Sequence, residues 1–166
     1  MPGHLIAFSG LPGTGKSTVA RALAADLGAV WLRVDSAEAA IAGSALAPPD
    51  LMDAGYAALY ALSQDNLALG HTVITDAVNP INLTREAFAN AAIEAGARFT
   101  QVEVICSDAA EHRARIEARH VRDARTPDWA TVAARAYDPH TDPHLVIDTA
   151  DDTPAASLAK LHALLA

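Results

Sequence analysis

Residues 10–17 read GLPGTGKS and satisfy the spacing G-x-x-x-x-G-K-[ST]. The apolar run LIAFS precedes this stretch at residues 5–9, and the helical pattern STVARALAADL follows it at residues 17–27. Glycines in such a strand-loop-helix unit let the backbone curl with its N–H groups pointing inward, which leaves a concavity the size of an anion. The stretch therefore predicts a phosphate-binding loop.

Two side chains of this loop predict further contacts with phosphate. Lys16 supplies a positive charge, and Ser17 places a hydroxyl at the start of the next helix, where it can bind Mg²⁺. The N-terminus of that helix also favours an anion. The residues expected to bind the phosphates are Gly10, Pro12, Gly13, Thr14, Gly15, Lys16, Ser17 and Thr18.

Apolar patterns along the rest of the chain predict an α/β fold. Short apolar runs predict strands at 4–9, 30–34, 71–75, 99–105 and 145–148, and helical spacing predicts helices at 17–27, 36–47, 51–69, 83–95, 109–120, 128–136 and 154–165. Strands that alternate with helices favour three layers, with a five-stranded parallel sheet between helices on both faces. We expect residues 1–166 to form a single domain, because this length is typical of one.

Charge and composition narrow the classes of partner. The net charge of −8 disfavours a long nucleic acid, since a polyanion is held mainly by clustered basic residues. The sequence has no apolar run long enough to cross a membrane, and its single cysteine, Cys106, cannot form an intramolecular disulfide. We therefore expect a cytoplasmic protein that is a monomer or a homodimer.

Further motifs follow the other predicted strands. Asp35 closes the second strand, GHTVITDAVNP at residues 70–80 contains Asp76 after the third, and TRE follows at residues 84–86. VICSD at residues 104–108 and VIDTA at residues 146–150 close the fourth and fifth strands, and an arginine-rich helix lies between these two. Together with the loop, these motifs resemble the P-loop small-molecule kinases across nearly the whole chain. That group includes gluconate kinase, adenylylsulfate kinase, chloramphenicol phosphotransferase, zeta toxins and polynucleotide kinase domains, and the closest likeness is to AAA-type bacterial proteins predicted to be kinases.

The resemblance implies a reaction more securely than a substrate. It implies a P-loop kinase fold with an arginine-rich lid at about residues 119–143, and ATP and Mg²⁺ as cofactors. The implied activity is transfer of the γ-phosphoryl group of ATP to a hydroxyl of a small molecule, with Lys16 stabilising the charge on the phosphates.

The resemblance also assigns roles to two aspartates. Asp35 would be the catalytic base that takes the proton of the acceptor hydroxyl, although an aspartate at this junction can instead cap the following helix. Asp76 would bind Mg²⁺ through water or contact the acceptor hydroxyl, and capping of the helix after Pro80 is an equal alternative.

Arginines supply the remaining positive charge. Arg115 and Arg119 lie four residues apart on one helical face, and they match the lid arginines that neutralise the transferred phosphate in related kinases. The alternative for this face is a solvated surface with i,i+4 ion pairs to Glu111 and Glu117. Arg119 is expected to contact the nucleotide as well.

Residues 36–69 are expected to lie on the acceptor side, with Asn79 and Arg85 nearby. Arg85 can alternatively form a surface ion pair with Glu86 or Asp76, which would contribute little. Many relatives have an arginine three residues after the strand-end aspartate, where it meets an anionic acceptor, but this chain has Glu38 there. Glu38 therefore favours a neutral or cationic hydroxyl compound.

Two other classes of function stay open. A nucleoside or nucleotide kinase uses the same scaffold, and a regulatory nucleotide-binding ATPase would need no phosphoryl acceptor. A GTPase is disfavoured because no N-K-x-D sequence occurs, and a motor ATPase is disfavoured because no glutamate follows Asp76 or Asp148. His140 and His144 each follow an Asp-Pro pair, and we expect both at the surface rather than in a metal site.

Overall fold

The computed structural model describes residues 2–45 and 47–166, and these form a sheet of five parallel strands between helices. The strands are β1 (His4–Ser9), β2 (Val30–Arg33), β3 (Thr72–Asp76), β4 (Arg98–Ile105) and β5 (Leu145–Asp148). They lie in the order β2-β3-β1-β4-β5, and every neighbouring pair is parallel. The predicted α/β fold is therefore confirmed.

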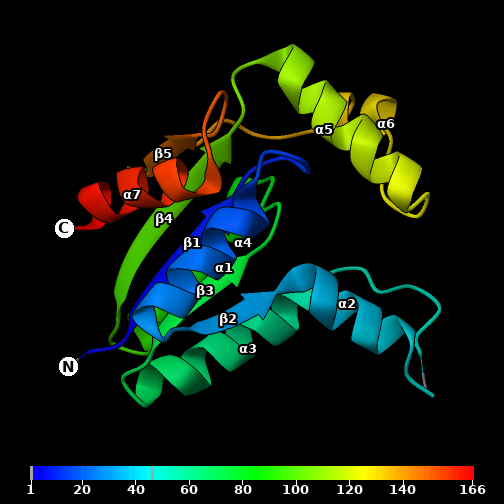
Figure 1. Cartoon of the computed structure of the whole chain (residues 1–166). Coiled ribbons are helices and arrows are strands. Elements are labelled where there is room, and N and C mark those ends of the chain that lie inside the picture. Colours follow the sequence, from blue (N-terminus) through cyan, green and yellow to red (C-terminus); the bar gives the residue numbers. More distant parts are fainter. Residues whose placement is uncertain (1, 46) are drawn as a thin grey trace.

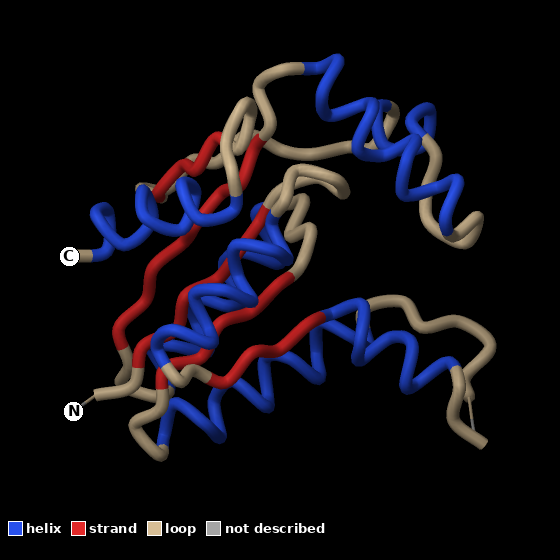
Figure 2. Tube along the Cα trace, viewed as in Figure 1, coloured by secondary structure: helices blue, strands red, loops and turns tan. Residues whose placement is uncertain are grey.

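Two groups of helices cover the two faces of the sheet (Figure 1). One face packs against α1 (Lys16–Leu27) and α7 (Pro154–Leu165), and the other against α2 (Val34–Ala42), α3 (Ala54–Ala68) and α4 (Asn82–Glu94). The two remaining helices, α5 (Ala109–Arg122) and α6 (Trp129–Ala133), lie beyond the carboxyl ends of the strands (Figure 2).

Alternation along β1 divides the hydrophobic core in two. Ile6 and Phe8 point into the cluster with α1 and α7, whereas Leu5 and Ala7 point into the cluster with α2, α3 and α4. All four residues are at most 1% exposed, as expected for a central parallel strand covered on both faces. The carboxyl end of β1 thus enters the loop at residues 10–17 from a fixed position.

One predicted boundary differs in a way that affects the site. The sequence predicts a strand to Val34 with Asp35 closing it, but β2 ends at Arg33 and α2 begins at Val34. Val34 is buried in the cluster with α3 and α4, and Asp35 falls in the first helical turn, where a negative charge is favourable. Asp35 is therefore a helical residue, and its position is set by α2.

The other helices match their predictions with shifted ends. The predicted helix at 51–69 begins only at Ala54, α2 ends at Ala42 before Gly43, and α6 is shorter than the predicted 128–136. Within the described residues, none of the helices is both long enough and apolar enough to cross a membrane.

Candidate functional site

The glycines of the loop at residues 10–17 adopt backbone angles that other residues rarely reach. Gly10 has φ +137°, and a Cβ there would lie 2.2 Å from the carbonyl oxygen of Val104 on β4. Gly13 has φ +83°, and its Cβ would lie 2.4 Å from Cδ1 of Ile116. The loop can therefore pass between β4 and α5 only where side chains are absent.

Helix α5 packs directly on this loop. The ring of His112 donates its Nε2–H to the carbonyl oxygen of Pro12 at 2.7 Å, and the same ring meets Trp129 edge-on with centroids 5.3 Å apart. Ile116 is buried beside Gly13. These contacts fix the position of the arginine-bearing face of α5 relative to the loop.

Lys16 and Asp76 form a buried ion pair at the base of the loop. Lys16 Nζ lies 2.8 Å from Asp76 Oδ1, and the two side chains are 10% and 2% exposed. Arg33 Nε lies 3.6 Å from Asp76 Oδ2, which is too long for a hydrogen bond, and Oδ2 has no hydrogen-bond partner among the described residues. Neither α2 nor α4 is capped by an aspartate side chain, because their N-caps are Arg33 and Ile81.

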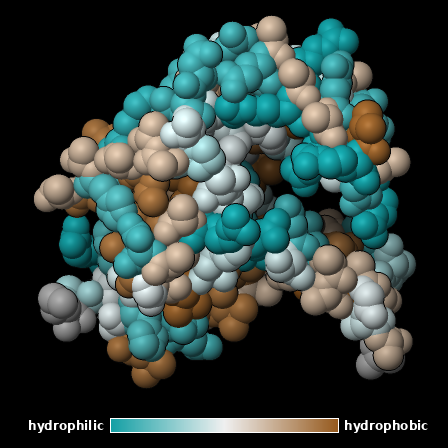
Figure 3. All heavy atoms as spheres, viewed as in Figure 1, coloured by the Kyte–Doolittle hydropathy of each residue, from teal (hydrophilic) through white to brown (hydrophobic). Residues whose placement is uncertain are grey.

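A cavity of about 700 Å³ opens between the loop, α2 and α5. The space-filling view shows this hollow between the hydrophilic atoms over α5 and α6 and the end of the molecule formed by α2 (Figure 3). Nine of the predicted site residues line it: Pro12, Gly13, Gly15, Lys16, Ser17, Thr18, Asp35, Arg115 and Arg119. Six do not line it: Gly10, Thr14, Glu38, Asp76, Asn79 and Arg85.

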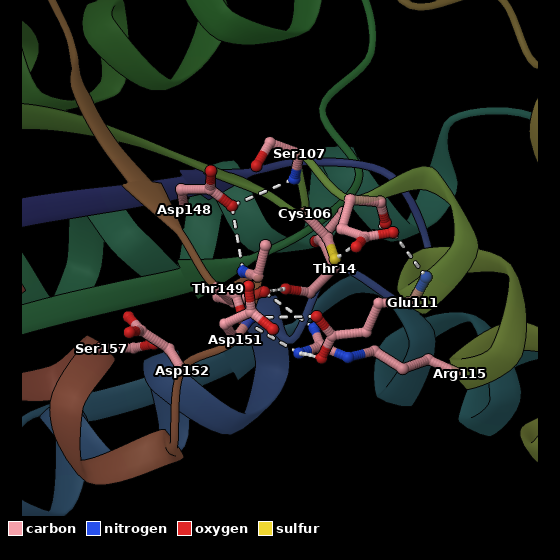
Figure 4. A network of polar contacts seen from close by, with 12 residues as sticks. Thr14, Cys106, Ser107, Glu111, Arg115, Asp148, Thr149, Asp151, Asp152 and Ser157 are labelled. Atoms are coloured by element: carbon pink, nitrogen blue, oxygen red, sulfur yellow. Dashed lines mark hydrogen bonds and ion pairs between the residues drawn. The ribbon is translucent and has the colours of Figure 1, made fainter.

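Arg115 joins α5 to the segment after β5 (Figure 4). Its Nη1 donates to Thr149 Oγ1 at 2.8 Å, and its Nη2 donates to the Thr149 carbonyl at 2.9 Å and to Glu111 Oε1 at 2.5 Å. Thr149 Oγ1 in turn donates to the Thr14 carbonyl at 2.7 Å, and Glu111 Oε2 accepts the backbone N–H of Asp151. Arg115 is thus held at the cavity wall by protein partners, and one of them is the i,i+4 ion pair with Glu111 that the alternative for this face expects.

The arginines next to it along the chain are less constrained. Arg119 has no side-chain partner among the described residues, and Arg122 donates only to the carbonyl of Ala118 in its own helix. Arg125 pairs with Asp123 at 2.9 Å. All three line the cavity, so positive charge faces the loop from across it.

Asp35 and Glu38 lie one turn apart on α2. The Asp35 side chain is 67% exposed and lines the cavity, with Arg33 Nη2 3.7 Å from its Oδ2. Glu38 packs over α3, since a Cβ on Gly55 would lie 2.5 Å from Glu38 Cγ. Burial and the negative charge of Asp35 raise the pKa of the Glu38 carboxyl, whereas the positive charge of Arg135 lowers it.

Arg85 does not reach the cavity. Its residue is 2% exposed, and its five N–H groups are all directed at protein oxygens: Asn79 O, Asn82 Oδ1, Pro139 O, Pro80 O and Asp138 O. Tyr137 lies below the guanidinium, with the ring centroid 5.0 Å from Cζ. In this structure Arg85 neither faces the cavity nor forms a surface ion pair. Its guanidinium is buried and binds the carbonyl oxygens of Asp138 and Pro139 in the chain after α6.

Asn79 lies in the turn that Arg85 holds. Its φ of +51° and its 1% exposure place it in a tight buried turn, and its backbone N–H donates to the hydroxyl of Tyr56 at 3.0 Å. Its side-chain oxygen has no partner among the described residues. Val78, the preceding residue, lines the cavity in its place.

The expectation that His140 lies at the surface is wrong. Its side chain is 2% exposed, and its Nε2 lies 3.0 Å from Oγ of Ser9, the residue before the loop. Burial and Arg85 lower its pKa to about 4, although Glu103 opposes this. His144 stacks on it and lies 3.3 Å from Glu103, but no group of three potential metal ligands occurs within residues 2–45 and 47–166.

Sequence reasoning gave no role to the side chains of Arg135, Thr149, Asp152 or Ser157, and the structure places all four on the cavity wall. Asp152 Oδ2 accepts from Ser157 Oγ at 3.2 Å and from Lys160 Nζ at 2.6 Å. Arg135 is the next arginine after the run that ends at Arg125, so its charge was the available signal. Thr149 and Asp152 lie in the segment that directly follows the fifth strand, and that position was their signal, whereas Ser157 carried none.

The donors beside Lys16 fit a magnesium ion. Ser17 presents a hydroxyl on the cavity wall, and Asp76 keeps a buried carboxylate oxygen without a hydrogen-bond partner among the described residues. Mg²⁺ prefers oxygen ligands, needs few carboxylates and retains several waters. The Ser17 hydroxyl and the Asp76 carboxylate are therefore oxygen donors of the kind that Mg²⁺ binds.

Comparison with known proteins supports the fold. The protein family described as AAA domain matches residues 5–139, and no curated protein sequence matches the chain. The chain is similar to the APS kinase CysC of Mycobacterium tuberculosis in complex with AMPPNP and APS, at 19% identity over 99% of this chain and 98% of that one, with TM-score 0.74. It is also similar to a sugar kinase of a Janibacter species, at 15% identity over 99% and 95% of the two chains, with TM-score 0.72. A third similar structure is Kti12 of Chaetomium thermophilum in complex with ADP-AlF3, at 20% identity over 98% of this chain and 99% of that one, with TM-score 0.69. The resemblance to P-loop small-molecule kinases is confirmed at the level of the fold.

Proposed function

This chain belongs to the AAA domain family, and from that premise we propose that it is an ATP-dependent kinase that phosphorylates a hydroxyl of a small molecule. One observation carries the proposal: a single cavity is lined by Lys16 and the arginines of α5 and also by the carboxylate of Asp35. A nucleotide-binding protein without an acceptor would not need an exposed carboxylate in the cavity that the phosphate loop lines.

The donor half of the proposed site binds ATP. Backbone N–H groups of residues 13–17 and the N-terminus of α1 would hold the phosphates, with Lys16 and Arg119 neutralising the charge on the γ-phosphoryl group. The solved structures with bound AMPPNP and ADP-AlF3 support a nucleotide as the ligand. Mg²⁺, held by Ser17 and through water by Asp76, would neutralise further phosphate charge.

The acceptor half is organised around Asp35. The acceptor hydroxyl oxygen attacks the γ-phosphorus, a new O–P bond forms, and the bond from that phosphorus to the bridging oxygen of ADP breaks. Asp35 takes the hydroxyl proton, and ADP leaves with the bridging oxygen. The exposed side chain of Asp35 and its place on the cavity wall leave room for a hydroxyl beside it.

We also propose that residues 1–166 form one domain in which residues 119–143 act as a lid. Arg122, Arg125, Pro127 and Arg135 belong to this segment and line the cavity from the side opposite the loop. Arg85 fixes its end through Asp138 and Pro139, so closure would be confined to the part before that anchor.

The test is transfer of label from γ-labelled ATP to a broad library of alcohols, including sugars and nucleosides, in the presence of Mg²⁺. We expect one chemical class to become labelled, and we expect Asp35→Asn to lower kcat at least a hundredfold with little change in ATP affinity. A nucleoside kinase would label only nucleosides. Label found only in inorganic phosphate, with every alcohol untouched, would contradict the proposed function and favour an ATPase.

A further inference from the structure

The cavity extends to both sides of the phosphate loop, along the carboxyl ends of the strands. The loop follows β1, which lies in the middle of the sheet, and β2 and β5 form the two edges (Figure 1). On the side of β4 and β5 the wall includes Arg115, Thr149 and Asp152. On the side of β2 and β3 it includes Asp35 and Val78, so this is the acceptor side of the proposed site.

Arg135 belongs to the side of β2 and β3. It lies three residues before Asp138, whose backbone N–H donates to the carbonyl oxygen of Pro80 at 2.7 Å. The buried guanidinium of Arg85 holds the same segment by donating to the Asp138 carbonyl at 2.7 Å. Pro80 follows β3, and β3 pairs with β2, which leads into Asp35. Arg135 and Asp35 therefore line the same end of the cavity.

The side chain of Arg135 is available to bind a ligand. Arg135 is exposed, and among residues 2–45 and 47–166 its side chain has neither an acidic partner nor a hydrogen bond. Arg115 and Arg125, which line the same cavity, have acidic partners at 2.5 and 2.9 Å. A guanidinium keeps its charge at any ordinary pH, and its planar fork fits a carboxylate or a phosphate. Arg135 thus offers an oxyanion site on the acceptor side.

Other arginines are better placed for the phosphates of the nucleotide. Arg119 and Arg122 lie on α5, and Ile116 of the same helix packs against Gly13 of the phosphate loop. Both arginines line the cavity next to that loop. Arg135 instead follows α6 and is tied to the end of β3, so its charge is directed at the acceptor.

We propose that the acceptor is a small alcohol that carries an oxyanion, which Arg135 binds while Asp35 receives the hydroxyl proton. This inference rests on the proposed kinase function and narrows the acceptor class. Glu38, from which the sequence favours a neutral or cationic compound, does not line the cavity, so the charge preference is set by Arg135. Because the carboxylate of Asp35 repels an anion, part of the carbon skeleton separates the oxyanion from the reacting hydroxyl.

The acceptor class is tested with sets of alcohols that share a carbon skeleton and differ in charge. One set is glycerol, serinol, glycerate and glycerol 3-phosphate, and another is sorbitol, gluconate and sorbitol 6-phosphate. With γ-labelled ATP and Mg²⁺, we expect an anionic member to have a kcat/KM at least tenfold above the neutral member of its set. Whether the carboxylate or the phosphate is preferred identifies the oxyanion. A smaller preference, or faster labelling of neutral or cationic members, would overturn the inference.

Variants assign the preference to Arg135. Arg135→Gln is expected to raise KM for the preferred anionic alcohol at least tenfold, while kcat, ATP affinity and KM for the neutral member change less than threefold. Arg135→Lys should recover part of the loss, because it keeps the charge but not the planar fork. Arg113→Gln is the matched control, since Arg113 pairs with Glu117 on the exposed face of α5 and is absent from the cavity wall.

The outcomes separate this inference from the proposed function. Labelling of sugars or nucleosides without a charge preference would leave the kinase function standing and overturn the inference. Absence of label on every alcohol in the broad library would overturn both. A tenfold loss of ATP affinity in Arg135→Gln, with an unchanged KM for the alcohol that is labelled best, would assign Arg135 to the nucleotide. That result would overturn the inference and leave the kinase function standing.

Discussion

Removal of the Lys16 side-chain charge tests the structure of the loop before any ligand is added. The 2.8 Å contact between Lys16 Nζ and Asp76 Oδ1 joins two buried side chains. Breaking a buried pair by deleting one partner costs about 3–5 kcal/mol, because the other charge stays buried and unpaired. In Lys16→Met the remaining cation is Arg33, 3.6 Å from Oδ2, so we expect the lower end, about 3 kcal/mol.

The reciprocal change should cost less. The Asp76 side chain is only 2% exposed, whereas Lys16 lines the cavity, where its freed ammonium can be hydrated. We therefore expect Asp76→Asn to lose about 1 kcal/mol and the double variant Lys16→Met with Asp76→Asn to lose about the same. For a chain of this length, about 3 kcal/mol lowers Tm by about 6–12 °C.

The assay is urea unfolding of the four proteins without nucleotide, followed by circular dichroism and by the fluorescence of Trp31 and Trp129. Lys16→Arg serves as the control, since it keeps a positive charge at the position. Equal losses in the free energy of unfolding for Lys16→Met and Asp76→Asn would refute the argument that the unpaired aspartate costs more than the unpaired lysine. A loss in the double variant equal to the sum of the two single losses would refute it as well. A loss below about 1 kcal/mol for Lys16→Met would refute the burial argument itself.

Three further predictions follow from contacts around the loop and the lid. Gly13→Ala should lower ATP affinity, measured by calorimetry, at least tenfold, because the added Cβ would lie 2.4 Å from Cδ1 of Ile116. The control Gly28→Ala should leave ATP affinity unchanged, because Gly28 also has a positive φ (+59°) but has nothing within 4 Å of the added Cβ. Equal losses of ATP affinity in the two variants would contradict a clash with Ile116. Arg85→Gln removes the donors to the carbonyl oxygens of Asp138 and Pro139, so a protease should cleave residues 119–143 of the native protein faster than in the unchanged protein. An unchanged cleavage rate would exclude the anchoring role of Arg85. Because the folded pKa of His140, about 4, lies below the ordinary 6.5, protons bind the unfolded state first, and stability should fall as the pH drops from 6.5 to about 4, by up to about 1.4 kcal/mol per pH unit. When the free energy of unfolding, obtained from urea unfolding, is plotted against pH over this range, His140→Gln should show a shallower slope than the unchanged protein. Identical slopes would contradict the role of His140.

The sequence predicted those parts of the molecule that depend on local patterns. The spacing of residues 10–17 and the apolar runs around it determine a strand, a loop and a helix, and repetition of that unit determines a parallel sheet. The end of each strand then places Asp76 and Thr149 near the loop, because the carboxyl ends of parallel strands share one edge.

Local sequence patterns could not predict contacts between segments that lie far apart in the chain. The sequence predicts Arg85 near the acceptor or in a surface ion pair, yet its partners at Asp138 and Pro139 lie 53 and 54 residues away. His140 is buried through Ser9, which is 131 residues away. The juxtaposition of Arg135 with Asp35 likewise depends on how the segment after α6 returns to the sheet, and no periodicity encodes that path.

The division of the core by β1 has a consequence for how this fold diversifies. Ile6 and Phe8 support α1, which carries the phosphate loop, whereas Leu5 and Ala7 support α2 and α3, which carry Asp35 and Gly55. Substitutions on separate faces that share no partners are expected to add independently. The acceptor side can therefore drift in sequence through repacking of its own layer while the phosphate loop keeps its geometry, so new substrates are accessible without a loss of nucleotide binding along the way.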